Sequence, residues 1–139
     1  MKTRILSGLL AIALVQFSCK EKNDDPQPNQ DPIIGSWYLK TLQANGQTAD
    51  VANLACYKDT RFVADEKTLT LTVSAPKQQG STDCQTQSQS AQWEKDGGKY
   101  YMVANGQRSD AGIQLNEAGQ TLQMMVTADG EPVTLTFQK

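Results

Sequence analysis

The sequence predicts an all-β protein, and within that class an eight-stranded antiparallel up-and-down β-barrel. Three observations predict it: apolar residues alternate with polar ones at period two, turn residues separate the apolar runs, and the composition is rich in Thr, Gln, Ser, Gly and Asn. A small β-sandwich is the alternative architecture. The 139 residues fit one domain, because domains of about 100 to 150 residues are the commonest size.

The strands are predicted from alternation. Residues 68–73 alternate Thr with Leu or Val, and residues 133–138 alternate Val, Leu and Phe with Thr or Gln. Half-buried antiparallel strands have this pattern, because successive side chains leave opposite faces of the sheet. The predicted strands lie at residues 35–43, 57–64, 68–74, 86–95, 99–104, 109–115, 120–127 and 132–138.

The connections are predicted from turn residues. Asn45-Gly46, Asn105-Gly106 and Asp129-Gly130 supply the positive φ that two-residue hairpins require. The connection at residues 45–55 is longer, and its Asp50 can cap a helical turn, so we expect a short helix or lid between the first two strands. Closing the sheet into a barrel would remove exposed strand edges.

The amino terminus has the features of a bacterial lipoprotein signal. Lys2 and Arg4 precede an apolar stretch at residues 5–17 that is too short to span a bilayer, and the small Ser18 stands directly before Cys19. We therefore expect a signal peptide at residues 1–18 and lipidation of Cys19, which would anchor the protein to a membrane. An ordinary cleaved signal with a free Cys19 is the alternative.

A tether is expected to separate the anchor from the folded domain. Residues 20–32 are charged residues, Pro, Asn and Gln, with nothing that can pack into a core. The predicted organisation is therefore a lipidated cysteine and disordered tether at 19–32 and a barrel domain at 33–139. Acidic residues after Cys19 resemble an export signal for the cell surface, so we expect the outer membrane, on its surface or its periplasmic face.

Cys56 and Cys84 are the cysteines left after Cys19. An exported protein lies in an oxidising compartment, so we predict a disulfide between them, closing a loop of about 29 residues. A redox-active or metal-binding pair is the alternative, and the chain has neither a CxxC spacing nor a histidine to favour it.

The composition excludes several classes of function. The chain contains no histidine, so Ser–His and Cys–His nucleophiles and the usual zinc sites are excluded. Without Lys2 and Arg4 the 13 basic residues become 11, against 15 acidic residues, so nucleic-acid binding has no electrostatic basis. No phosphate loop or nucleophile elbow is present. We expect no enzymatic activity, no cofactor and no metal.

The first strand carries a family motif. Gly35-Ser36-Trp37 resembles the GxW signature of lipocalins, and further matches extend along the chain. With these matches the chain resembles the lipocalin-like domain of small bacterial outer-membrane lipoproteins over residues 33–139. The matching residues are Ile34, Asn45-Gly46, Cys56 to Thr60, Phe62, Cys84, Trp93 and Tyr100 to Met102.

The resemblance implies a calycin-type barrel that binds a small hydrophobic molecule in its interior. The candidate interior residues are Trp37, Leu39, Phe62, Leu69, Leu71, Trp93, Tyr101, Met124 and Phe137. The alternative is that these side chains fill the barrel and that the domain is an interaction module of the envelope. Such a module would bind a protein or a glycan through its loops or its polar Gln/Ser/Thr face.

Overall fold

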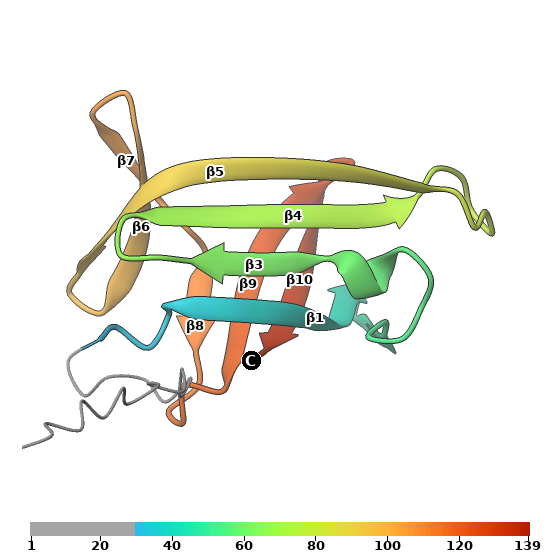
Figure 1. The fold of residues 1–139 in the computed structure, drawn as a ribbon, viewed down its shortest axis with the longest axis horizontal. Helices are drawn as coiled ribbons and strands as arrows, with labels where there is room; N and C mark the ends of the chain where they lie inside the picture. Colours follow the sequence, from blue (N-terminus) through green and yellow to red (C-terminus); the bar gives the residue numbers. More distant parts are fainter. Residues whose placement is uncertain (1–29) are drawn as a thin grey trace, which may run out of the picture.

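The computed structural model describes residues 30–139, so the predicted signal peptide at 1–18 and the lipidated Cys19 lie outside the described residues. The described part folds into ten strands and a short 3-10 helix, η1 (Tyr57–Asp59) (Figure 1). The strands are β1 (Gly35–Ala44), β2 (Gln47–Asp50), β3 (Arg61–Ala64), β4 (Thr68–Pro76), β5 (Cys84–Asp96), β6 (Lys99–Ala104), β7 (Gln107–Asp110), β8 (Ile113–Leu115), β9 (Thr121–Ala128) and β10 (Glu131–Gln138).

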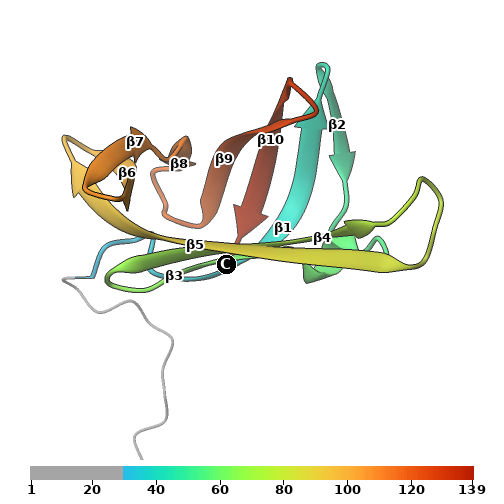
Figure 2. The ribbon, with the colours of Figure 1, turned by 90° about the horizontal axis from the view of Figure 1, so that it is seen from above.

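All ten strands belong to one antiparallel sheet. Nine of them follow the order β7-β6-β5-β4-β3-β1-β10-β9-β8, and β2 pairs with the second half of β1. Figure 2 shows β3, β4 and β5 as one wall, from which β1, β10 and β9 rise, while β6, β7 and β8 curl up at one end. The all-β class and a nearly closed antiparallel barrel are therefore confirmed, and the strand count of eight is wrong.

One segment nearly closes the barrel, and it accounts for part of the difference in strand number. The predicted strand at 109–115 is divided into β7, which pairs with β6, and β8, which pairs with β9. The division falls at Gly112, whose φ is +64°, and a Cβ there would lie 3.0 Å from the carbonyl oxygen of Met125. Gly112 therefore lets the chain change partners while it stays close to β9.

The predicted helix or lid between the first two strands is not found. The Asn45-Gly46 turn leads into β2, which pairs back onto β1, and the chain then turns. The Asp50 carboxylate accepts a hydrogen bond from the Ala52 amide at 3.1 Å, so the capping signal in the sequence serves a turn. Helical geometry occurs later, in η1, which takes the start of the predicted strand 57–64 and leaves β3 shorter.

The two-residue hairpin turns are confirmed. Asn45, Asn105 and Asp129 have φ of 51°, 51° and 52°, and each is followed by a glycine that also has positive φ. Turns of this hand match the right-handed twist of the flanking strands, so they set the register of β1–β2, β6–β7 and β9–β10.

The core lies between the wall formed by β3, β4 and β5 and the strands β1, β10 and β9 that rise from it (Figure 2). Trp37, Ile33, Leu122 and Phe137 are completely buried, and Phe62 is 1% exposed. They come from the N-terminal segment and from strands β1, β3, β9 and β10, so the core joins strands that are far apart in sequence. Burial of this apolar surface is the main force that holds the curled sheet together.

Candidate functional site

Most side chains predicted to face the interior are buried in the core. Trp37, Leu39, Phe62, Leu69, Met124 and Phe137 are each less than a tenth exposed, and Leu71 and Trp93 are half-buried against them. The rings of Phe62 and Phe137 lie 6.2 Å apart, centre to centre. These side chains therefore belong to one hydrophobic core inside the barrel.

Tyr101 corrects the predicted set, because its side chain lies on the outer face. The register pairs Trp93 with Met102 and Lys95 with Tyr100, so the inward position belongs to Tyr100, which is 4% exposed. The Tyr101 ring lies under the Arg108 guanidinium at 4.1 Å, on the outer side of the sheet. The prediction therefore places the inward-facing tyrosine of β6 one residue too far along the strand, at Tyr101 instead of Tyr100.

Arg108 links this outer surface to β5. Its guanidinium is 3.0 Å from Glu94 and 3.0 Å from Asp96, and the hydrogen bond to Asp96 raises the pKa of Arg108 further. All three side chains are largely exposed to solvent, so the cluster contributes little to stability.

The N-terminal segment seals one end of the barrel. The Trp37 indole N–H donates to the Ile33 carbonyl oxygen at 2.7 Å. The Lys139 ammonium lies 4.7 Å from the centre of the Trp37 ring and donates to the Pro32 carbonyl oxygen at 2.8 Å. Both chain ends of the described part therefore meet over the tryptophan, and together they cover it from solvent.

Asp31 fastens that segment to the opposite wall. Its carboxylate accepts hydrogen bonds from the Tyr100 hydroxyl at 2.7 Å, the Lys95 ammonium at 2.9 Å and the Ile33 amide at 3.0 Å. Burial acts to raise the pKa of Asp31, but the three hydrogen bonds outweigh it and lower that pKa. Burial and the bond to Asp31 raise the pKa of Tyr100 to about 12. Asp31, predicted to belong to the tether, therefore contacts the folded domain.

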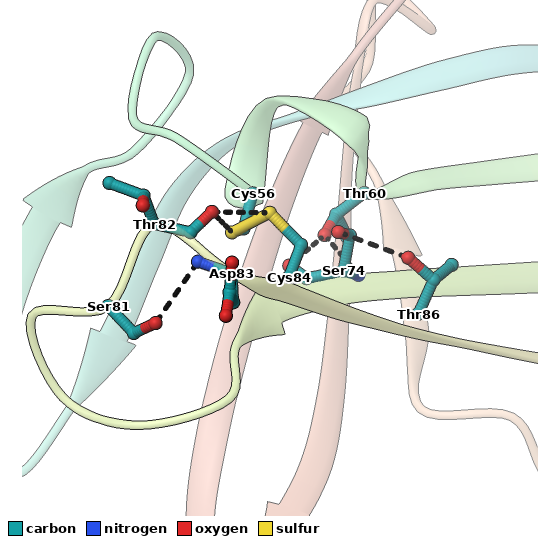
Figure 3. Close-up of a disulfide and its surroundings, with 8 residues drawn as sticks. All are labelled: Cys56, Thr60, Ser74, Ser81, Thr82, Asp83, Cys84 and Thr86. Atoms are coloured by element: carbon teal, nitrogen blue, oxygen red, sulfur yellow. Dashed lines mark hydrogen bonds between the residues drawn. A yellow bond between two sulfur atoms is a disulfide. The ribbon is translucent and has the colours of Figure 1, made fainter.

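The other end carries the disulfide (Figure 3). Cys56 and Cys84 are bonded to each other, with Cα atoms 5.3 Å apart, which confirms the predicted pair and ties η1 to the start of β5. Beside it the buried Thr60 hydroxyl donates to the Ser74 carbonyl oxygen at 3.1 Å and accepts from the Ser74 amide at 3.0 Å. The polar groups buried here are therefore satisfied within the protein.

The clearest hollow is a half-open groove of about 850 Å³ at the surface, near β6, β8 and β9. None of the nine residues predicted to contact a ligand lines this groove or the smaller hollow of about 260 Å³ beside β8. The groove has a mixed lining of apolar and charged residues, among them Ile113, Met125, Val126, Pro132, Lys95 and Lys99.

The described residues form no cluster of metal ligands and leave no buried polar side-chain atom unpaired. Residues 30–139 contain no group of three His, Cys, Asp or Glu side chains close enough to bind a metal ion. Within the same range, every buried side-chain nitrogen or oxygen has a hydrogen-bond partner. No helix among them is long and apolar enough to cross a membrane.

A polar surface covers the outer side of β4 and β5. Thr70 and Ser90 share a hydrogen bond of 2.8 Å, and Thr72 and Ser88 share one of 2.9 Å. Farther along, where Ser74 is buried beside Thr60, the Thr86 hydroxyl donates to that of Ser74 at 3.3 Å. We call these three pairs the hydroxyl ladder. It is rigid because each side chain is held by one on the neighbouring strand.

The first half of β5 has no neighbour on its second edge. β4 pairs with residues 84–92 of β5, but β6 pairs only with residues 92–96. Within the described part of the chain, residues 84–90 of β5 therefore form a free edge, and all seven are exposed (Figure 1). A strand at residues 86–95 is predicted from the sequence, but the free edge depends on how far β6 extends alongside it.

Neither a family model nor a curated protein sequence matches this chain, so inference of its function depends on the site itself.

Proposed function

We propose that this chain is a lipid-anchored protein of the cell envelope whose folded domain is a binding module with a filled core. The observation that carries the proposal is the packing of Phe62 against Phe137 in the barrel interior, together with a hollow that none of the predicted ligand residues lines. A barrel of this size either fills itself or holds one small ligand. The filled core favours recognition at the outer surface.

The surface best suited to recognition is the pair β4 and β5. Its outer face presents the Thr70–Ser90 and Thr72–Ser88 pairs of the hydroxyl ladder, and its inner face presents the exposed amides of Gln85, Gln87 and Gln89. Hydroxyl and amide groups both donate and accept hydrogen bonds, so they suit uncharged polar partners such as a protein backbone or a glycan. The partner proposed for this surface is therefore a component of the envelope.

We also propose that the barrel is of the lipocalin-like type. Support comes from Trp37 of the Gly35-Ser36-Trp37 motif, which lies at the sealed end under an N-terminal segment that crosses the barrel. The cation of Lys139 over its ring completes that end. The fold type alone assigns no ligand.

The surface proposal is tested by photocrosslinking in the envelope of the host. A photoreactive amino acid at Thr72, within the hydroxyl ladder, should produce a defined adduct with an envelope component. The matched control is Gln123, which is exposed on β9 between two paired strands and should produce none. Equal labelling from both positions would refute recognition through β4 and β5.

The anchor is tested separately. Cys19→Ala removes the thiol that would be acylated, so the variant should leave the membrane fraction and appear in the soluble fraction. If the variant fractionates with the membrane as the native chain does, lipidation of Cys19 is refuted.

A second function, capture of a small amphipathic molecule, is favoured by the surface groove. Its volume of about 850 Å³ matches that of small-molecule sites, and it combines apolar residues with charged residues of both signs. Native mass spectrometry of protein purified from its host would show a co-purifying mass in this case. Met125→Arg, at a largely exposed position in the groove, should abolish that mass.

A further inference from the structure

We propose that the free edge of β5 pairs in antiparallel fashion with the same edge of a second copy of this chain. The two sheets would then become continuous across a two-fold axis. This inference deepens the proposed function, on which it depends, by naming one partner for the β4–β5 surface.

The direction of the backbone groups supports the pairing. The Trp93 amide donates to the Lys67 carbonyl oxygen at 3.0 Å, on the β4 side of β5. Because backbone groups alternate in direction along an antiparallel strand, the even-numbered residues Thr86, Ser88 and Ser90 turn their N–H and C=O groups away from β4. The free edge therefore carries three residues whose backbone donors and acceptors face outward.

The free edge lacks the usual protection against pairing. Residues 84–90 read CQTQSQS, with no charged residue and no proline. The register with β4 runs without a bulge from Pro76↔Cys84 to Thr68↔Gln92. Natural sheets protect exposed edges with lysines, prolines or bulges, and a flat edge without them is a template for another strand.

The edge is also self-complementary. In a two-fold pairing that keeps each sheet face continuous, residues of the same parity stand opposite each other. With the axis at Thr86, threonine meets threonine on the outer face and Gln85 meets Gln87 on the inner face. With the axis at Ser88, serine meets serine and Gln87 meets Gln89. In either register the residues at the axis pair hydroxyl with hydroxyl and the glutamines beside them pair amide with amide, with no like charges opposed.

The strand is held in place before pairing. The hydroxyl ladder fixes β5 to β4, and the disulfide fixes Cys84 to Cys56 at the beginning of the strand. A rigid strand loses less conformational entropy when it binds, so a short pairing contributes more to affinity. Confinement of an anchored chain to a membrane surface would raise the effective concentration of its copies further.

The test uses the full lipidated chain in the host membrane and in detergent. Thr86→Cys and Ser88→Cys each add one thiol at a candidate axis position, and Gln123→Cys is the matched control on an edge-free strand. We expect mild oxidation to produce a disulfide-linked dimer from at least one edge variant and none from the control. Monomers from both edge variants, equal cross-linking from the control, or cross-linking to a different protein would overturn the proposal.

A second measurement uses charge. Ser88→Lys places two ammonium groups against each other if the axis lies at Ser88, and Thr86→Lys does so if the axis lies at Thr86, so sedimentation equilibrium in detergent should show dimerisation weakened by about tenfold in at least one of these edge variants. Gln123→Lys should leave dimerisation unchanged, and an equal effect of Gln123→Lys and of both edge variants would contradict the pairing. If the chain is monomeric and the photoreactive residue at Thr72 still forms an adduct with an envelope component, only the dimer is refuted. If the chain dimerises and Thr72 forms no adduct with any other component, the proposed function is limited to self-association.

Discussion

Removal of the Cys56–Cys84 disulfide tests how the domain is stabilised. The bond joins residues 28 apart in sequence, so it closes a loop of 29 residues in the unfolded chain. On the chain-entropy model, a loop of that size lowers the entropy of the unfolded state by about 12 cal/mol/K, or about 3.6 kcal/mol at 25 °C. We therefore expect Cys56→Ala/Cys84→Ser to lose roughly that free energy of unfolding.

The assay is equilibrium unfolding in urea, followed by tryptophan fluorescence. With a urea dependence of about 1.5 kcal/mol/M, the midpoint should fall by about 2 M. A loss below about 1 kcal/mol would refute the reasoning, since it would mean that the cross-link hardly constrains the unfolded chain.

A matched variant separates the cross-link from the backbone at residue 56. Cys56 has φ of +69°, a conformation that costs a non-glycine residue about 1 kcal/mol or more. Cys56→Gly/Cys84→Ser should therefore be more stable than the alanine variant by about that amount. If the two variants are equally stable, backbone strain at Cys56 makes no contribution.

Three further predictions concern the junction of β7 and β8 at Gly112 and the sealed end of the barrel. Gly112→Ala should lower the melting temperature more than Gly80→Ala, because both glycines have positive φ but only at Gly112 would the added Cβ lie within 4 Å of a neighbouring backbone. Equal losses from the two variants would contradict this. Lys139→Met should lower the free energy of unfolding, measured in urea, by about 1 kcal/mol, because it removes the cation over Trp37. An unchanged urea midpoint would show that this contact does not stabilise the fold. The pKa of Asp31 is lowered from 3.8 in the folded state, so its carboxylate stabilises the fold above about pH 4 and loses this effect as the pH falls. The free energy of unfolding of Asp31→Asn should therefore depend less on pH below about 4 than that of the native chain.

Much of the fold was predictable from local signals. The alternation at residues 68–73 and 133–138 places β4 and β10, and the Asn45-Gly46 turn fixes its hairpin. These signals are local, because side-chain direction and φ are set within a few residues. The Cys56–Cys84 pair was predictable because only two cysteines remain for the domain.

The rest depended on tertiary context. The division of 109–115 at Gly112 depends on the approach of Met125 from β9, which a local pattern does not encode. Tyr100 and Tyr101 are adjacent aromatics, so only the register against β5 decides which one faces inward. The side chain over Trp37 belongs to Lys139, more than a hundred residues away, and the sequence carries no signal for it.

The route of the chain through β7 and β8 has a consequence for how the barrel opens. These two short strands are joined by Ala111 and Gly112 alone, and the Ala111 amide bonds to β6 while the Gly112 carbonyl accepts from β9. The ring of strands is thus nearly closed by one stretch of nine residues, which bonds first to β6 and then to β9. Detachment of this stretch would uncover β6 and β9 together, so the circle should part in a single event rather than strand by strand.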